Sequence, residues 1–441
     1  MELRCAILGQ SNSIKRDGFL YAVLNDPGII VTRLGRLGAS PSVIGPYFAD
    51  DDFFATSDFC IIDLCVVDHS ALAWSALDLY QIMQWVDWIG HKARKNGCQP
   101  IFVLIPPDDI ASANPLLSVY HAIIRRNAYF YLDVRDLVAE LAARDGATVA
   151  SLYADGSHPG PQLSAIIGTT ILAFLRGAAR IAYRPVRVTF PLKTFRNVHL
   201  ADDAGRPGKV VEYRNSFMAM RGVRIEPGDC AVIRTGEIDA LHGILVNAAC
   251  CRSKVAIEGS SRVVKNLNLR PYGDSEFEAR MLPVCTPLRD CNGMVSITLA
   301  AEEAIVGERS MEEMSQAVAG LRRVEIAALV VETGTRLVTY DAAWPELEAV
   351  NLRRYATTHA AGRRTVDTVL RAIAARDARR AGAGWGGAGW TVAGAFRPGK
   401  PRRDLRLGAR RSPPRVSGAP RNLGQRRGDC DGCGRALSGR P

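Results

Sequence analysis

The sequence predicts the α/β fold class for this chain of 441 residues, a length that fits two or three folding units. Three observations define the architecture that we predict. Up to about residue 177, apolar runs alternate with longer helical patterns, which indicates a three-layer α/β/α domain with a parallel sheet in residues 1–180. Residues 185–335 hold short strand-like runs between turn residues, which predicts a β-rich, sandwich-like domain. Residues 336–441 become rich in Arg, Gly and Pro, which predicts a tail that is helical at first and then disordered.

The first domain contains five apolar runs that we predict to be strands, separated by helical patterns. Runs that are apolar throughout are typical of strands that a parallel sheet buries on both faces. Ligands of such sheets bind at the carboxyl ends of the strands, so we expect the chemistry in the loops that follow strands. The strands are Arg4–Gly9, Ile29–Leu34, Asp58–Val67, Pro100–Ile105 and Ala128–Val134, and the helices are Ser13–Asn25, Ala71–Asn96, Leu116–Asn127 and Ile166–Leu175.

The second domain is predicted from strand-like runs and turn signals. Glu226-Pro-Gly-Asp229 marks a turn, because Pro fixes φ and Gly accepts a positive φ. The pattern predicts a sandwich or jelly roll, interrupted by a helix at Ser310–Arg323. The predicted strands are Val186–Phe190, Lys209–Tyr213, Cys230–Arg234, Gly243–Asn247, Lys254–Glu258, Met294–Leu299 and Ile326–Glu332.

The net charge of +11 comes mainly from the tail. Residues 401–441 hold eleven Arg and three Asp without Lys or Glu, so they contribute +8 and leave +3 for the first 400 residues. The folded part is therefore near neutral and is not expected to bind nucleic acid, which only the basic tail would contact, and then non-specifically. A helix is predicted for Trp344–Arg380, whereas the Gly-rich segment that follows cannot form a packed core. A GC-rich gene read out of frame gives the same composition, a hypothesis that resequencing near codon 335 tests.

Cysteine usage and the start of the chain predict a cytoplasmic protein. Several of the 11 cysteines lie in apolar runs, where we expect them to be buried and reduced (Cys5, Cys60 and Cys65). The chain opens Met-Glu-Leu-Arg without a cleavable signal, and no stretch is as long and apolar as a membrane span, so no membrane partner is expected. Cys430 and Cys433 form a lone pair without further ligands nearby, so neither a metal nor an organic cofactor is expected.

Ser11 is the candidate nucleophile. It lies in Ile7-Leu8-Gly9-Gln10-Ser11-Asn12-Ser13, directly after the first predicted strand, where Gly9 permits a sharp exit and Ser11 opens the first helix. Free backbone N–H groups and the positive end of the helix dipole meet there, which is where an acyl-transfer enzyme needs its nucleophile and part of its oxyanion hole. Ser and Asn are also common helix caps, so this motif alone does not decide.

His158 is the candidate general base, in Tyr153-Ala-Asp155-Gly-Ser-His158-Pro-Gly160. One tight turn lets the Asp155 carboxylate accept a hydrogen bond from one ring nitrogen of His158, which leaves the other nitrogen free to take a proton from a serine. A solvated loop is the commoner origin of a lone Asp-x-x-His. The remaining candidate histidines lie on helical or linker patterns, and we interpret them as surface or packing residues (His91, His121 and His199).

Together the two motifs resemble the SGNH (GDSL-type) serine hydrolase family, which places its serine after the first strand and its Asp-x-x-His before the last helix. The match covers about residues 4–177, and Gly-Gln-Ser-Asn is most similar to the carbohydrate O-acetylesterase branch. The resemblance implies a flavodoxin-like SGNH fold and a catalytic triad of Ser11, Asp155 and His158. The glycine of the family's second block is matched by Gly38, with Gly35 as the alternative, and its N–H would join that of Ser11 in the oxyanion hole.

The third block of the family pattern is where this sequence departs. Gly-x-Asn-Asp reads Cys65-Val66-Val67-Asp68, so the oxyanion-hole asparagine falls on Val67, which has no side-chain donor. Losing one such donor typically lowers the rate by ~10²–10³. Three outcomes follow: a slow esterase, an enzyme in which Asn12 or His69 supplies a substitute donor, or an inactive relative kept for binding. We therefore expect Asn12, Asp68 and His69 to line the cleft, with a partly exposed loop histidine as the alternative for His69.

The sequence and the resemblance predict a serine esterase that hydrolyses or transfers an O-acyl group, with an acetyl group on a sugar hydroxyl as the favoured substrate. Its partner would be a small-molecule or glycan ester. Hydrolase and transferase both stay open, because they use the same triad and differ in whether water or another hydroxyl reaches the acyl-enzyme. The alternative is a catalytically inactive SGNH-like binding or assembly protein in polysaccharide biosynthesis, which Val67 favours and the triad residues oppose.

Overall fold

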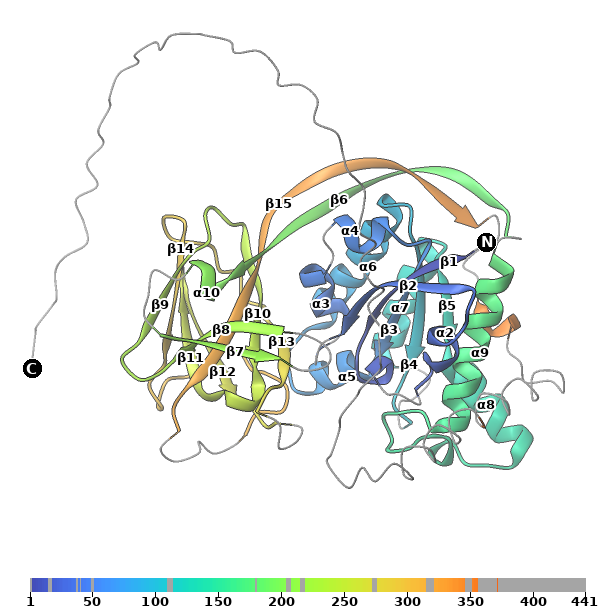
Figure 1. Cartoon of the computed structure of the whole chain (residues 1–441), viewed down its shortest axis with the longest axis horizontal. Helices are drawn as coiled ribbons and strands as arrows, with labels where there is room; N and C mark the ends of the chain where they lie inside the picture. The colour runs from blue at the N-terminus through green and yellow to red at the C-terminus, as the bar shows by residue number, and fades with distance from the viewer. Residues whose placement is uncertain are drawn as a thin grey trace, which may run out of the picture. The chain divides into compact units, whose positions relative to one another are not determined.

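A five-stranded parallel sheet lies at the centre of residues 2–178, which we call the α/β region (Figure 1). The computed structural model describes residues 2–14, 18–36, 39, 41–48, 51–108, 114–178, 181–203, 208–214, 219–271, 276–314, 321–345, 351–355 and 371. Every residue of β3 and β4 is buried, which explains why these runs are apolar throughout. The strand order is β2-β1-β3-β4-β5, and the strands are β1 (Leu3–Gly9), β2 (Ile29–Arg36), β3 (Phe59–Cys65), β4 (Gln99–Ile105) and β5 (Phe130–Asp133).

Helices cover both faces of this sheet. Successive residues of a strand point to opposite faces, so Leu8 and Ile62 pack in one core with α3, α6 and α7, while Ile7 and Ile61 pack in a second core with α2, α8 and α9. Figure 1 shows α3 and α6 on one side of the sheet and α2 and α9 on the other. The helices are α1 (Ser11–Ile14), α2 (Tyr21–Leu24), α3 (Pro41–Phe48), α4 (Asp51–Ala55), α5 (Val66–Ala73), α6 (Leu79–Lys95), α7 (Pro115–Arg126), α8 (Val134–Asp145) and α9 (Pro161–Gly177), with a 3₁₀ turn at Ala150–Leu152.

The single helix predicted at Ala71–Asn96 is two helices, α5 and α6. Between them Ser75 has a φ of 53°, which ends the first helix. Asp78 then starts the second one with a capping box, because its carboxylate accepts from the backbone N–H of Gln81 at 2.7 Å and its own N–H donates to the Gln81 side chain at 3.1 Å. The capping signal Asp-x-x-Gln is present in the sequence and marks the start of α6.

Two antiparallel sheets lie within residues 181–345, which we call the β region. One has the order β13-β10-β15-β8-β7 with β6 also paired to β15, and the other has the order β12-β11-β14-β9. Apolar residues of both sheets share one core, including Ile244 and Leu329 of the first sheet and Ile257 and Ile297 of the second. The elements are β6 (Tyr183–His199), α10 (Leu200–Asp203), β7 (Lys209–Arg214), β8 (Ala219–Ile225), β9 (Cys230–Arg234), β10 (Ala240–Asn247), a 3₁₀ turn (Ala248–Cys250), β11 (Arg252–Glu258), β12 (Arg262–Asn268), β13 (Ala279–Pro283), β14 (Met294–Leu299) and β15 (Val324–Pro345). Another 3₁₀ turn (Leu352–Tyr355) follows β15, and its Leu352 packs in the core of the α/β region.

Strands β6 and β15 pair with each other over their whole shared length and form a two-stranded ribbon that reaches the α/β region (Figure 1). The pairing runs from Tyr183 opposite Pro345 to His199 opposite Ala328. Aromatic residues of α6 anchor the ribbon: the Trp88 Nε1–H donates to the Lys193 carbonyl at 2.9 Å. The chain therefore crosses between the regions twice, once in each strand.

The prediction of the α/β fold class is wrong. Of the fifteen strands in the described residues, ten lie in the two antiparallel sheets and five in the parallel sheet. The alternating pattern of the first 180 residues indicates only the parallel sheet, whereas the β region contributes most of the strands. Strands β6 and β15 span 17 and 22 residues, far longer than the usual strand of about five or six. The apolar runs Val186–Phe190 and Ile326–Glu332 marked only a part of each.

The remaining expectations concern the chain beyond residue 309. The helix predicted at Ser310–Arg323 is wrong for its described residues, 310–314 and 321–323, which form turns, a bridge and irregular backbone. The helix predicted at Trp344–Arg380 begins with two residues that belong to β15, and most of its remainder lies outside the described residues. So do the Gly-rich segment and the Cys430–Cys433 pair. The predicted domain boundary near residue 335 falls inside β15 and stays a prediction. No helix in the described part of the chain is long and apolar enough to cross a membrane.

Candidate active site

The carboxyl edge of the parallel sheet collects the loops that carry the candidate residues. Strands β1, β3 and β4 run parallel as neighbours, and Cys65 at the end of β3 lies opposite Ile105 at the end of β4. Ser11 follows β1 at this edge, and Val66–His69 follows β3. Parallel strands bring their carboxyl ends together, so residues far apart in sequence meet here.

The Asp155–His158 loop is hydrogen-bonded to the residues that follow β4, Pro106–Asp108, at the same edge of the sheet. The Tyr153 hydroxyl donates to the Pro106 carbonyl at 2.9 Å, and the Asp108 N–H donates to the Gly156 carbonyl at 2.7 Å. Gly156 has a φ of 70°, and a Cβ at this position would lie 3.3 Å from an Asp108 carboxylate oxygen. The loop therefore needs a glycine at Gly156 to lie against the end of β4.

Asp155 holds the His158 ring in one orientation. The His158 Nδ1 lies 2.7 Å and 2.9 Å from the two carboxylate oxygens of Asp155. The same carboxylate accepts the backbone N–H of His158 at 3.0 Å and that of Ser157 at 3.3 Å. The Nε2 atom has no hydrogen-bond partner among the described residues, and the His158 side chain is 19% exposed. This geometry leaves Nε2 free to act as a general base.

The Ser11 hydroxyl shares this edge but makes no hydrogen bond to the His158 ring within the described part of the chain. Ser11 is half-buried and is the first residue of α1. Catalytic hydrogen bonds are often long in enzymes without substrate and tighten when the substrate binds. The structure thus brings Ser11 and the Asp155–His158 pair to one edge of the sheet without direct contact.

The turn that carries Ser11, residues Gly9–Ser13, is tightly packed. A Cβ on Gly9 would lie 2.2 Å from the Ser13 Oγ, so only glycine leaves room for the Ser13 side chain. The Ser13 N–H donates to the Gln10 carbonyl at 3.0 Å and closes the turn. Gln10, Asn12 and Ser13 are all buried, which leaves Ser11 as the more accessible residue between them. We call residues Gly9–Ser13 the nucleophile turn.

Asp63 in β3 supports this turn, and sequence reasoning missed it. Its side chain is fully buried and accepts hydrogen bonds from Gln10 Nε2 at 3.2 Å and from Ser13 Oγ at 2.9 Å. Burial raises the pKa of Asp63 to about 7, although these hydrogen bonds act to lower it. The signal was available: an aspartate in the middle of the apolar run Asp58–Val67 must be buried if that run is a central strand, and a buried carboxylate needs donors.

The segment Cys65–Asp68, which aligns with the third block of the SGNH pattern, has a strained backbone and a hydrogen-bonded Val67 N–H. Cys65, which stands where the family has glycine, has φ 104° and ψ −60°, a conformation that favours glycine. The Val67 N–H donates to Gln10 Oε1 at 3.0 Å, so this backbone group is already taken. Neither the side chain nor the N–H of Val67 is therefore free to bind an oxyanion.

The remaining oxyanion-hole candidates have different surroundings. Gly38 lies outside the described residues. Gly35 lies in β2, where a Cβ would meet Leu8 at 2.9 Å and Phe48 at 3.0 Å, so its lack of a side chain serves packing. Asn12 is 2% exposed, and neither its amide nitrogen nor its amide oxygen has a hydrogen-bond partner among the described residues. Of these three residues, Asn12 is the one with a free side-chain donor next to Ser11 in the chain.

Asp68 and His69 lie in the first turn of α5. Asp68 is fully buried, and its carboxylate accepts the Ser42 hydroxyl at 2.6 Å and the Tyr120 hydroxyl at 2.5 Å. Asp68 therefore joins α5 to α3 and α7 and has no surface in a cleft. His69 is half-buried.

A second Asp–His pair lies at the end of β5. His121 Nε2 is 2.8 Å from Asp133 Oδ2, and Arg135 Nη2 is 2.6 Å from the same oxygen. Burial alone would raise the pKa of Asp133, but the hydrogen bonds from His121 and Arg135 outweigh it and lower the pKa to about 2. Asp133 also caps α8 through the Arg135 N–H at 3.0 Å, so we interpret the cluster as structural.

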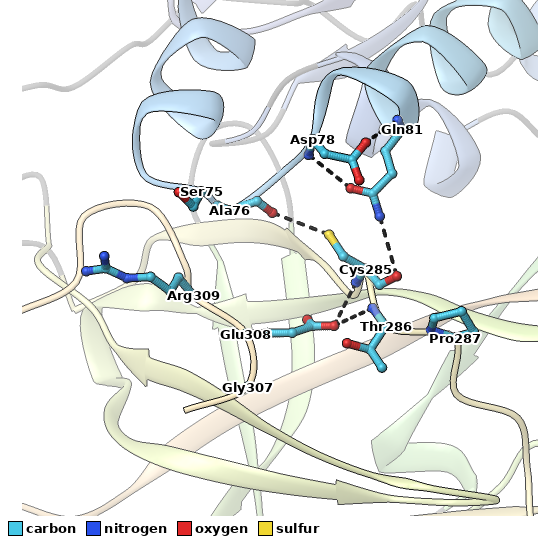
Figure 2. A pocket seen from close by; sticks show the side chains of 10 residues that line it. All are labelled: Ser75, Ala76, Asp78, Gln81, Cys285, Thr286, Pro287, Gly307, Glu308 and Arg309. Carbon is cyan, nitrogen blue, oxygen red and sulfur yellow. Dashed lines mark hydrogen bonds between the residues drawn. The ribbon is translucent and has the colours of Figure 1, made fainter. Parts of the chain in front are cut away.

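A cavity of about 450 Å³ lies where the turn before α6 meets two loops of the β region (Figure 2). Helix α6 runs back from the carboxyl edge of the sheet, so its first residues lie at that edge. Cys285 joins the two walls: its thiol donates to the Ala76 carbonyl at 3.4 Å, and its carbonyl accepts from Gln81 Nε2 at 3.4 Å. Figure 2 shows Glu308 accepting the N–H groups of Cys285 and Thr286 on the side of the β region. The lining mixes apolar and polar groups, and its charged side chains Asp78, Glu308 and Arg309 each have a partner within the protein.

The described residues contain no group of three His, Cys, Asp or Glu side chains placed to hold a metal ion.

Comparisons with known proteins found matches among solved structures but none among family models or curated proteins. No family model and no curated protein matches the chain. A two-domain esterase (CEX) active on acetylated mannans matches with a TM-score of 0.49 and 13% identity over 76% of this chain and 92% of that one. The same kind of esterase co-crystallised with mannopentaose gives a TM-score of 0.48 and 13% identity over 76% of this chain and 91% of that one. The tail fiber protein gp63.1 from an E. coli phage gives a TM-score of 0.29 and 9% identity over 78% of this chain and 47% of that one. Likeness at this level is too low to support a conclusion about activity.

Proposed function

We propose that this chain is a serine esterase that hydrolyses, or transfers, an O-acyl group, with an acetyl ester of a carbohydrate as its substrate. Ser11 is the nucleophile, His158 the general base and Asp155 the group that orients the base. The observation that carries the proposal is the Asp155–His158 pair, joined at 2.7 Å with the other ring nitrogen free, at the sheet edge that also holds Ser11. The carbohydrate substrate rests on the resemblance of Gly9–Asn12 to the O-acetylesterase branch of the SGNH family.

The proposed reaction has two halves. In the first, Ser11 Oγ attacks the ester carbonyl carbon while His158 Nε2 takes the hydroxyl proton; the tetrahedral intermediate then expels the sugar oxygen, to which His158 returns the proton. In the second, water or another hydroxyl attacks the acyl group on Ser11, His158 takes its proton, and the Ser11 oxygen leaves with that proton. Asp155 stabilises the imidazolium that forms in each half.

The proposed oxyanion hole consists of the backbone N–H groups of Ser11 and Gly38. The family's asparagine is replaced by Val67, whose own N–H is bound to Gln10. The loss of one donor of this kind lowers kcat by ~10²–10³, so we expect a slow enzyme on simple esters unless another donor takes the place of the asparagine. The unpartnered amide of Asn12 is the candidate for that donor.

The test is turnover of p-nitrophenyl acetate by the full chain and by Ser11→Ala and His158→Ala. We expect each variant to lose at least about 100-fold in kcat relative to the wild type, because the two residues act as a unit. His199→Ala, at an exposed histidine of the β region, is the matched control and should keep wild-type activity. A series of acetylated sugars then locates the substrate.

Val67 favours a second function, that of a catalytically inactive binding or assembly protein. A wild type that turns over neither p-nitrophenyl acetate nor any acetylated sugar faster than Ser11→Ala, in water or with an acceptor hydroxyl present, would overturn the esterase proposal in favour of this second function. Binding of the same sugars measured by calorimetry on wild type and Ser11→Ala would then be equal, because a binding protein does not need the nucleophile.

A further inference from the structure

Asp63 contacts the nucleophile turn on both sides of Ser11. Its carboxylate accepts from Gln10, the residue before Ser11, at 3.2 Å and from Ser13, two residues after it, at 2.9 Å. Gln10 also reaches the loop after β3, where its Oε1 accepts the Val67 N–H at 3.0 Å. One buried side chain of β3 thus connects the nucleophile turn to the loop that carries the family's third block.

The nucleophile turn is too short to be stable without contacts from elsewhere in the fold. Helix α1 spans only four residues, and a single helical turn is unstable by itself because nucleation fixes several residues for one hydrogen bond. The direction of the Ser11 hydroxyl must therefore be set by contacts from outside the turn. Asp63 provides two of them, from a strand whose every residue is buried.

Stability does not explain why a carboxylate occupies this position. The neighbours Ile61 and Ile62 are fully buried, and an apolar residue in place of Asp63 would avoid the desolvation of a charge. Burial raises the pKa of Asp63 to about 7 even with two donors bound, which shows how poorly the site accommodates the ionised form. A residue that works against stability in a fold core is expected to have another role.

We propose that Asp63 is a positioning residue for the serine chemistry: through Gln10 and Ser13 it fixes the direction of the Ser11 hydroxyl toward His158. The inference rests on the proposed function, since it assigns a role to Asp63 in the reaction of Ser11. Asp63 does not touch the substrate. Its removal should therefore lower kcat and leave KM unchanged.

The experiment compares Asp63→Leu and Asp63→Asn with the wild type, using the full chain and p-nitrophenyl acetate. Leucine fills the site without hydrogen bonds, so we expect kcat to fall by about 10- to 100-fold, the loss typical of a displacement of up to one ångström, with KM within about twofold and no fall in the melting temperature. Asparagine can accept from Gln10 through its oxygen and donate to the Ser13 hydroxyl through its nitrogen, so it should restore most of kcat.

Asp26→Leu is the matched control. Asp26 is also a carboxylate little exposed to solvent (6%), but it lies in the turn before β2 at the opposite edge of the sheet, where it accepts the Gly28 N–H at 2.9 Å and pairs with Arg176. Its loss should lower the melting temperature and leave kcat unchanged. If Asp63→Leu does not fold, Ser13→Ala takes its place, because it removes one of the two contacts at a smaller change in volume.

The outcomes separate the inference from the proposed function. A folded Asp63→Leu with kcat within about twofold of wild type, while Ser11→Ala is inactive, overturns the positioning role and leaves the esterase proposal standing. A wild type no faster than Ser11→Ala overturns both. A large fall in kcat with unchanged KM and melting temperature, restored by Asp63→Asn, supports the inference.

Discussion

Two buried histidines should make the contact between the ribbon, β10 and α6 sensitive to acid. His242 in β10 is 5% exposed, and its ring lies 4.3 Å from that of Trp85 on α6. His91 on α6 is 6% exposed, stacks on Phe190 of β6 at 3.7 Å, and lies 2.7 Å from the Tyr340 hydroxyl of β15. Both rings are therefore buried in the contact that joins the two regions.

Burial sets the size of the effect. It lowers the pKa of His242 from 6.5 to about 3, with a further contribution from Lys193, and it lowers the pKa of His91 to about 4 against the opposing charge of Asp87. Each histidine binds its proton more readily in the unfolded chain, so its stabilisation is complete above pH 6.5 and is lost as the pH falls toward the folded-state value. At about pH 5 each contributes a loss of about 2 kcal/mol in the free energy of unfolding, or about 4 kcal/mol together.

The assay is denaturant unfolding of the full chain at about pH 7.5 and pH 5, followed by tryptophan fluorescence and circular dichroism. His242→Gln and His91→Gln each remove one titrating ring, so the difference between the two pH values should change by about 2 kcal/mol in each variant relative to wild type. His199→Gln, at an exposed histidine of the same strand that carries Phe190, is the control and should show the wild-type difference.

Titration of Asp63 changes the free energy of unfolding in the same pH range with the opposite sign. Asp63 is present in all four proteins, so this contribution cancels when a variant is compared with the wild type. The reasoning is refuted if His242→Gln shows the same difference between the two pH values as the wild type, because a ring with so low a folded-state pKa must contribute to it. A difference that changes equally in His199→Gln would refute the assignment to buried rings.

Three further predictions follow from the edge of the sheet. Burial raises the pKa of Asp63 from 3.8 to about 7 in the folded chain, so its stabilising effect is complete below pH 3.8 and is lost as the pH rises to 7. Asp63→Asn should abolish this pH-dependent change, which amounts to up to about 4 kcal/mol in the free energy of unfolding. Cys65→Gly should be more stable than Cys65→Ala in thermal unfolding by about 1 kcal/mol, the reverse of the usual order, because φ is 104°. Gly9→Ala should lower kcat on p-nitrophenyl acetate by about 100-fold, because the added Cβ displaces Ser13.

Local pattern was enough to locate the strands of the parallel sheet. The runs Arg4–Gly9 and Pro100–Ile105 correspond to β1 and β4 within two residues, because a strand buried on both faces must be apolar throughout. The Asp155–His158 contact also follows from local sequence, since three residues and a glycine with φ 70° bring the two side chains together. Features that depend only on residues within one segment can therefore be predicted from the sequence of that segment.

The ribbon could not be predicted in the same way. Each residue of β6 faces a partner in β15 more than a hundred positions away, as Tyr183 faces Pro345, and no local pattern records such a pairing. The outer stretch of β15 alternates exposed and half-buried residues with Thr and Arg between them, which resembles a loop when the partner strand is unknown. His91 is a packing residue, one of the two alternatives that the sequence allows, but its partners Phe190 and Tyr340 come from the ribbon and could not be identified from local pattern.

The nucleophile turn shows where local and distant constraints meet. Gly9 and Ser13 are four residues apart, and their packing requires glycine whatever the rest of the chain does. The side chain that contacts this turn, however, is Asp63 in the third strand, 50 residues after Ser13. Gln10 contacts both that strand, through Asp63, and the loop after it, through the Val67 N–H. The motif in residues 9–13 therefore indicates the proposed nucleophile, but not the residue that we propose to position it. Val67 has no side-chain donor and its N–H is bound to Gln10, so the contacts of Gln10 with Asp63 and Val67 connect the nucleophile turn to the loop after β3.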